Sequence, residues 1–313
     1  MNRSASDREP FDVAEAVRLL NGGRDEVLRG GALIDAAAER NDPAALERRA
    51  LFEAVGFARP QSWARALDSL QEAAEHGSAS AGDQLRILAR AGEDRQDWTS
   101  LRSAVSIEQL VRPPQRRSIA ETPKLRALEG FATAGECLWL MNAARDRLRP
   151  ATVVTPSGSQ TVEAARTNRV VAFHWADMDV VIEVIRARIS AATGLPLPLF
   201  EASQVLHYAP GQEFSAHHDY FDPQNPGHAE QLKRGQRIAT FLLYLNDDYA
   251  GGETDFPRAA LGFRGRAGDA LFIINVDQSG KPDPLTLHAG TPPQSGEKWI
   301  FSQWIRDRAP PTN

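Results

Sequence analysis

The chain has 313 residues, of which 42% are hydrophobic and 25% charged, with a formal net charge of -5 and one cysteine, Cys137. This composition excludes fibrous and disordered classes, and the length allows two domains. The acidic balance argues against a nucleic-acid partner, which usually needs a basic face. The sequence shows no secretory signal and no membrane-spanning run, and its single cysteine suits a reducing compartment, so we expect a cytoplasmic protein.

Helical spacing dominates the first part of the chain, which is rich in Ala, Leu, Glu and Arg. The segment "AAERNDPAA" at 37–45 lies 36 positions before "AAEHGSASA" at 73–81, and the same offset pairs Leu51 with Ile87. Such a period predicts an all-α helical-repeat domain over residues 1–110, in which each unit buries its apolar face against the next. The segment resembles the tetratricopeptide class and its Sel-type relatives. An irregular helical bundle is the alternative.

The pattern changes at "VRPPQRRSIAETPK", where Pro and Arg interrupt the helical spacing, and we predict a linker over residues 111–125. Two helices are expected after it. Thr133 and Glu136 form a capping box at the start of the first. Apolar residues at helical spacing from Met178 to Ile189 indicate the second, which Gly194 should end.

From Gln204 onward the sequence is typical of strands. Short β-branched, aromatic and aliphatic runs alternate with Gly, Pro and Asp clusters; the runs are "QVLHY", "RIATFLLYLN", "DALFIIN" and "KWIFSQWI". We therefore predict an α+β chain in which residues 126–313 form a double-stranded β-helix, or jelly roll, with supporting helices.

The segment "AHHDYF" at 216–221 contains the strongest chemical signal. On a strand His217 and Asp219 point to one side, whereas His218 points to the other. An imidazole and a carboxylate placed in this way form two thirds of a facial triad, the arrangement that holds ferrous iron with open coordination sites. His288 is the candidate for the third ligand. Lys298, ten residues later, could place an amine in a water-poor barrel and pair with an acidic cosubstrate.

The ordered set of motifs from about residue 126 to 308 resembles the prolyl 4-hydroxylase branch of the iron(II) and 2-oxoglutarate-dependent dioxygenases. The motifs that carry the resemblance are "FATAGECLWL", "ATVVTPSGSQTVEAARTN" at 151–168, "HYAPGQEFSAHHDYF", "RIATFLLYLNDDYAGGETDFP", "GDALFIIN", and "HAG" followed by "GEKWIFSQWI".

The resemblance implies a role for each matching residue, with no catalytic side chain beyond the metal centre. It implies iron ligands at His217, Asp219 and His288, 2-oxoglutarate contacts at Tyr208, Thr240 and Lys298, and substrate contacts at Arg166, Phe214, Trp304 and Arg306. Two of these positions depart from the family pattern. Phe214 replaces a tyrosine of close peptidyl-proline enzymes, and Arg306 replaces a histidine; both departures lie on the substrate side, whereas the cofactor positions keep the family pattern.

The activity that the resemblance implies is hydroxylation of a C–H bond with Fe(II), 2-oxoglutarate and O2, releasing succinate and carbon dioxide. The resemblance also brings ascorbate into consideration as a further cofactor. A prolyl or other residue of a peptide or protein is the expected substrate, because a helical array suits extended segments. A free amino acid or small metabolite is one alternative, and a non-catalytic metal- or 2-oxoglutarate-binding scaffold or sensor is another. The oligomeric state is left open.

Overall fold

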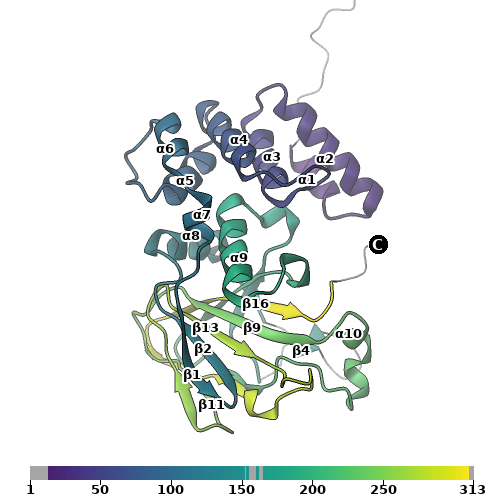
Figure 1. The fold of residues 1–313 in the computed structure, drawn as a ribbon, viewed down its shortest axis with the longest axis vertical. Helices are drawn as coiled ribbons and strands as arrows, with labels where there is room; N and C mark the ends of the chain where they lie inside the picture. Colours follow the sequence, from purple (N-terminus) through teal and green to yellow (C-terminus); the bar gives the residue numbers. More distant parts are fainter. Residues whose placement is uncertain (1–12, 152, 155–159, 162–164, 310–313) are drawn as a thin grey trace, which may run out of the picture. The chain divides into compact units, whose positions relative to one another are not determined.

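The computed structural model describes residues 13–151, 153–154, 160–161 and 165–309. The motif at 151–168 therefore lies partly outside the described residues. The contacts divide the chain into two compact units. One contains the chain up to Ile107 together with His174–Glu183, and the other contains Glu108–Phe173 and the chain from Val184 onward (Figure 1).

The first unit is helical. Its helices are α1 (Val13–Leu19), α2 (Arg24–Ala38), α3 (Pro43–Val55), α4 (Trp63–Glu75), α5 (Ala79–Leu88) and α6 (Trp98–Ala104). Asp42 caps α3 by accepting a hydrogen bond from the Ala45 amide, and Ser78 caps α5 by accepting one from the Ala81 amide. These caps stand at equivalent positions of the two repeated segments, so α2–α3 and α4–α5 follow the sequence period. Membership of the tetratricopeptide or Sel class stays a prediction.

Residues 174–183 belong to this helical unit although they lie far along the chain. The Arg48 guanidinium donates to three backbone carbonyls of residues 175–178, at distances of 2.9 to 3.2 Å. The Gln84 side chain accepts a hydrogen bond from the Val180 amide at 3.0 Å. Polar side chains of α3 and α5 thus satisfy backbone groups of an irregular segment, as buried backbone requires.

The second unit contains the helices predicted after residue 126. Its helices are α7 (Ile107–Val111), which begins at the division, α8 (Ala134–Arg145), α9 (Val180–Thr193), whose first turn groups with the other unit, and α10 (Ala229–Lys233). The predicted capping box of Thr133 and Glu136 is present at α8. Arg188 of α9 forms a buried ion pair with Glu136 at 2.6 Å, so this capping carboxylate also joins α8 to α9.

The predicted linker at 111–125 is wrong over most of its length. Residues Arg116–Glu121 form strand β1 and Lys124–Leu128 form β2, and these two strands pair as a hairpin. β2 also pairs with β13 (Ala270–Ile274), which makes it an integral part of the main sheet. The hairpin was missed because Arg and Pro usually indicate the end of a regular element. The exposed side of a hairpin at a sheet edge tolerates the same polar residues.

An eight-stranded sheet and a four-stranded sheet form the barrel, and the predicted jelly-roll fold with a helical amino-terminal region is confirmed. The order of the larger sheet is β1-β2-β13-β9-β16-β7-β6-β3, and that of the smaller is β12-β11-β14-β8. The remaining strands are β3 (Arg149–Pro150), β4 (Val153–Val154), β5 (Gln160–Thr161), β6 (Arg169–Ala172), β7 (Gln204–Tyr208), β8 (Phe214–His217), β9 (Arg237–Tyr244), β10 (Ala250–Gly251), β11 (Thr254–Phe256), β12 (Leu261–Phe263), β14 (His288–Gly290), β15 (Pro293–Ser295) and β16 (Lys298–Arg306). Of these, β4 pairs with β5, and β10 with β15. Short 3-10 turns are η1 (Trp175–Asp177), η2 (Leu197–Leu199), η3 (Pro226–His228) and η4 (Pro284–Thr286).

Strand β16 shows how the larger sheet builds the interior. Alternate residues of a strand share one face, and Lys298, Ile300, Ser302 and Trp304 all line the same pocket. β16 lies between β7 and β9, so both of its edges are paired. This position fixes the register of its inward-facing side chains.

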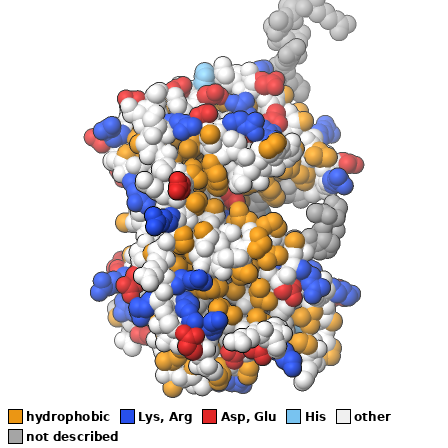
Figure 2. Space-filling view, in the orientation of Figure 1, with side chains coloured by type: hydrophobic (Ala, Val, Ile, Leu, Met, Phe, Trp, Pro, Cys, Tyr) orange, Lys and Arg blue, Asp and Glu red, His pale blue; other side chains and the backbone are white. Residues whose placement is uncertain are grey.

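The surface carries charges of both signs. On the face shown in Figure 2, Lys and Arg side chains alternate with Asp and Glu side chains, with hydrophobic surface between them. Such a mixture is typical of globular proteins. Among the described helices, none combines the length and the apolar content needed to cross a membrane.

Candidate active site

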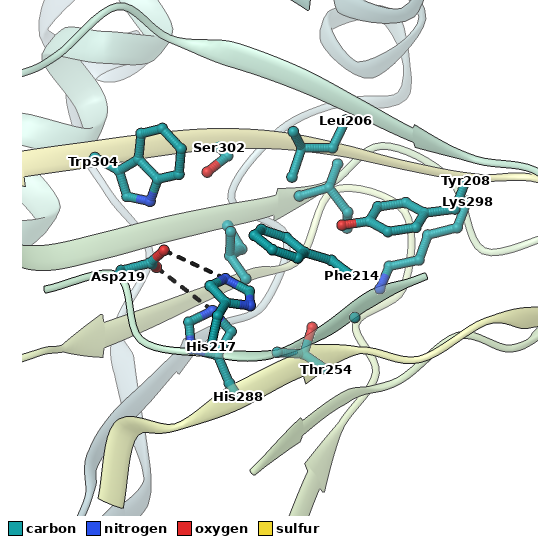
Figure 3. A pocket seen from close by; sticks show the side chains of 13 residues that line it. Leu206, Tyr208, Phe214, His217, Asp219, Thr254, His288, Lys298, Ser302 and Trp304 are labelled. Atoms are coloured by element: carbon teal, nitrogen blue, oxygen red, sulfur yellow. Dashed lines mark ion pairs between the residues drawn. The ribbon is translucent and has the colours of Figure 1, made fainter. Parts of the chain in front are cut away.

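Two neighbouring strands of the smaller sheet bring the predicted ligands together. His217 of β8 and His288 of β14 are direct partners in the antiparallel register, and their ring centroids lie 4.5 Å apart. Asp219 follows β8 by two residues. One Asp219 oxygen lies 3.6 Å from His217 Nε2, and the other lies 3.5 Å from His288 Nε2. The ligand atoms of the three residues all lie within 4.8 Å of one another, which is compatible with a single metal ion (Figure 3).

Backbone carbonyls orient both imidazoles. His217 Nδ1 lies 2.9 Å from the Ser215 carbonyl oxygen, and His288 Nδ1 lies 2.9 Å from the Thr286 carbonyl oxygen. A carbonyl can only accept, so each Nδ1 carries the proton and each Nε2 presents a lone pair. Metal-bound histidines are usually held in this way. His218 points away from the triad, as predicted, and its Nε2 contacts the Pro284 carbonyl oxygen.

The protonation of the triad suits a cation. Burial lowers the pKa of His288 to about 4, so its imidazole is neutral at physiological pH. Burial alone would raise the pKa of Asp219, but the charge that His288 carries in acid and the hydrogen bond from the Thr240 hydroxyl outweigh this effect and hold the pKa well below its usual range. The site therefore offers two imidazole nitrogens and one carboxylate, the donor set of ferrous oxygenases.

Thr240 contacts the metal ligands rather than the end of the pocket where Lys298 lies. Its hydroxyl donates to an Asp219 oxygen at 2.6 Å, and the Asn275 side-chain amide donates to the same hydroxyl at 3.0 Å. The predicted role of Thr240 as a 2-oxoglutarate contact therefore does not match its position. The relay from Asn275 through Thr240 fixes the direction in which Asp219 points.

Replacing Thr240 with valine should weaken divalent-metal binding. Thr240→Val keeps the side-chain shape but removes the donor to Asp219, and loss of such an outer contact typically costs about 10- to 100-fold in metal affinity. Calorimetric titration with Mn²⁺ measures this change. Thr240→Ser is the matched control because it keeps the hydroxyl. Equal Mn²⁺ affinity in Thr240→Val and the wild type would show that the relay does not position the carboxylate.

A buried amine occupies the other end of the same pocket. Lys298 of β16 is paired in register with Tyr208 of β7, and both are almost completely buried. Burial lowers the pKa of Lys298 to about 7, although the Glu253 charge opposes this shift. No carboxylate of the described residues forms an ion pair with Lys298. A cavity with a buried, unpaired amine suits an anionic ligand, whose charge would favour the protonated form of the amine.

Thr254 of β11 is a lining residue that the sequence did not single out. Its hydroxyl shares a 2.7 Å hydrogen bond with the Tyr244 hydroxyl, and it lies on the Lys298 side of the pocket (Figure 3). Gly290 also lines the pocket, and a Cβ atom there would lie 3.1 Å from the Tyr208 hydroxyl. The strand register could have indicated Thr254, but only once the pairing of β11 with β14 was known.

The predicted substrate residues divide into two groups. Phe214 and Trp304 line the pocket, and Arg166 lies over the Phe214 ring with its guanidinium carbon 4.4 Å from the ring centroid. Arg306 does not line the pocket. Its guanidinium donates to Glu201 at 2.8 Å and to the Gln231 and Gly235 carbonyls, so the predicted substrate contact is corrected to a structural role.

These observations define a class of protein: a jelly-roll oxygenase whose two-histidine, one-carboxylate triad faces a buried lysine amine across one pocket. Residues 203–306 match the family model described as the 2OG-Fe(II) oxygenase superfamily.

Two similar curated relatives are from Arabidopsis thaliana. Probable prolyl 4-hydroxylase 4 is 33% identical over 232 residues, which cover 67% of this chain and 76% of that protein. Prolyl 4-hydroxylase 1 is 35% identical over 208 residues, which cover 61% and 71%. A solved structure, the viral collagen prolyl hydroxylase vCPH from Paramecium Bursaria Chlorella virus-1 in its 2OG complex, is 30% identical with a TM-score of 0.45, covering 58% of this chain and 95% of that one.

The chain belongs to the prolyl 4-hydroxylase-like family of the 2OG-Fe(II) oxygenase superfamily, and it is an oxidoreductase that uses iron and 2-oxoglutarate. The residues of the pocket suit both iron and 2-oxoglutarate. The triad supplies ligand atoms for iron, and the unpaired Lys298 amine at the opposite end suits the distal carboxylate of a dicarboxylic keto acid.

Proposed function

We propose that this protein hydroxylates a prolyl residue of a peptide or protein, with iron held by His217, Asp219 and His288. The observation that carries the proposal is the pocket itself, in which these ligands and the Lys298 amine lie at opposite ends (Figure 3). The relatives named prolyl 4-hydroxylases support the choice of substrate. Bound iron with 2-oxoglutarate and O2 supplies the oxidising chemistry, which belongs to the metal rather than to a side chain.

The protein's own residues bind and orient the reactants. Lys298 would donate to the distal carboxylate of 2-oxoglutarate, with the Tyr208 and Thr254 hydroxyls beside it. Burial raises the pKa of Tyr208 to about 12, so its phenol remains a hydrogen-bond donor at neutral pH. Apolar side chains of the larger sheet, among them Leu206 and Ile300, line the space between the two ends and exclude water.

Trp304 is the candidate surface for the target residue. It lines the pocket on the side of Asp219 (Figure 3), and the Arg237 guanidinium lies 3.7 Å from the centroid of its ring. Arg237 is in turn held by Glu201 through two hydrogen bonds of 2.7 and 2.9 Å. A fixed aromatic ring beside the metal site suits a compact apolar ring such as that of proline.

A free amino acid or small metabolite is the alternative substrate. The test is incubation with Fe(II), 2-oxoglutarate and O2, with a proline-rich synthetic peptide in one arm and free L-proline in the other. Mass spectrometry should detect one added oxygen atom on the peptide together with equimolar succinate. Oxidation of free proline alone would favour the alternative. Metal and 2-oxoglutarate binding without succinate in either arm would contradict the proposal.

A further inference from the structure

An aromatic ring is stacked directly on one of the candidate metal ligands. The Phe214 ring lies parallel to the His217 imidazole, with centroids 3.5 Å apart and an interplanar angle of 12°. The two residues are three apart on β8, and His217 is the more solvent-accessible of the two histidine ligands, with 21% of its side chain exposed against 6% for His288. Phe214 therefore covers a face of the ligand that has less protein around it.

The other face of the Phe214 ring is covered as well. The Arg166 guanidinium carbon lies 4.4 Å from the ring centroid, and an imidazole at 3.5 Å already fills one face, so the guanidinium occupies the opposite one. Backbone pairing between the two segments keeps the guanidinium and the Phe214 ring in this arrangement. Arg166 and Phe214 form an isolated antiparallel bridge, and the Ser215 amide donates to the Ala165 carbonyl at 2.8 Å. With both faces occupied, only an edge of the ring is left to contact a substrate.

We infer that Phe214 is a positioning residue for the metal ligand His217, rather than a contact surface for the substrate. The inference rests on the proposed iron site. The hydrogen bond from His217 Nδ1 to the Ser215 carbonyl fixes one edge of the imidazole, and the Phe214 ring fixes its plane. Together they restrict rotation of the imidazole, so that Nε2 points toward His288 and Asp219 before any metal binds. Such preorganisation strengthens binding because less freedom is lost in the complex.

The role requires a flat ring and not a hydroxyl group. Phe214→Leu removes the stacked ring, whereas Phe214→Tyr keeps it. We expect Phe214→Leu to bind Mn²⁺ about 2- to 10-fold more weakly than the wild type, the range that stacked aromatic pairs contribute. We expect Phe214→Tyr to bind Mn²⁺ within about twofold of the wild type, because the same ring pair remains.

The matched control is Phe263→Leu. Phe263 is, like Phe214, a partly buried ring packed against the same hydrophobic cluster, but its ring contact is with Tyr244 and not with a ligand histidine. Phe263→Leu should therefore leave Mn²⁺ affinity unchanged. Melting temperatures of the metal-free variants show whether each is folded, and Phe214→Met, which retains bulk without a ring, replaces the leucine variant if that does not fold.

Calorimetric titration with Mn²⁺ and steady-state kinetics with the proline-rich peptide decide the matter. Weaker Mn²⁺ binding in Phe214→Leu with an unchanged peptide KM supports the inference. Unchanged Mn²⁺ affinity with a raised peptide KM would assign Phe214 to the substrate and overturn it. Failure of the wild type itself to bind Mn²⁺ would instead contradict the proposed iron site, so the two ideas fail in different ways.

Discussion

His217→Ala should abolish metal binding while leaving the fold intact. The variant removes one of three ligands from a site in which each ligand atom faces the same point, so we expect Mn²⁺ affinity to fall by more than about 100-fold, beyond the effect of losing an outer contact. His217 is partly exposed and lies at a strand end. Its loss should therefore cost the metal-free protein no more than about 1 kcal/mol.

His218→Ala is the natural control for this experiment. It removes the same type of side chain one position further along, where the imidazole points away from the triad toward the Pro284 carbonyl. Calorimetry with Mn²⁺ and thermal melting of the metal-free proteins measure both effects. If His218→Ala lost metal binding and His217→Ala retained it, the orientation of this segment would be wrong.

Lys298→Met should remove most of the affinity for 2-oxoglutarate. The methionine has a similar length and no charge, so it deletes the cation and keeps the packing against Tyr208. A hydrogen bond to a charged group contributes about 1.5 to 3 kcal/mol, which corresponds to a roughly 10- to 100-fold higher KM for 2-oxoglutarate. Lys281→Met, at an exposed turn, is the control. An unchanged KM in Lys298→Met would exclude this amine as the anchor.

The same substitution should change how stability depends on pH. The pKa of Lys298 falls from its ordinary value of 10.5 to about 7 in the folded chain. Between these values the unfolded lysine holds a proton that the folded one has released, so the ligand-free protein becomes more stable as pH rises across this window. Thermal melts from pH 7 upward should show this slope in the wild type and a smaller one in Lys298→Met. A bound dicarboxylate should also reduce it by favouring the charged amine.

Sequence reasoning worked best where one strong local pattern determines the outcome. The capping box at Thr133 and the apolar spacing of α9 predicted two helices, and the alternation of His217 and Asp219 correctly separated them from His218. The jelly roll followed from strand runs together with the family resemblance. In each of these cases the deciding information lies within a few residues or in an ordered set of motifs.

It failed where pairing between distant strands decides the environment. Thr240 was placed near 2-oxoglutarate, but the β9 register places it opposite Trp304 and in contact with Asp219. Arg306 was predicted to contact the substrate, but its guanidinium donates to Glu201 and to backbone carbonyls near α10. The hairpin of β1 and β2 was missed because its edge position permits a polar composition. Sequence spacing cannot reveal partners of this kind.

The clamp that Arg48 forms on residues 175–178 bears on how the protein can be divided for biochemistry. A fragment that starts after α7 would keep every candidate iron and 2-oxoglutarate residue, yet it would leave those backbone carbonyls without their guanidinium and the Val180 amide without Gln84. These backbone groups at the start of α9 would then need water as their hydrogen-bond partner. Loss of activity in such a truncation could therefore result from damage to this segment as well as from loss of a peptide-binding surface on the helical unit. The variant Arg48→Met in the intact chain separates the two effects more cleanly.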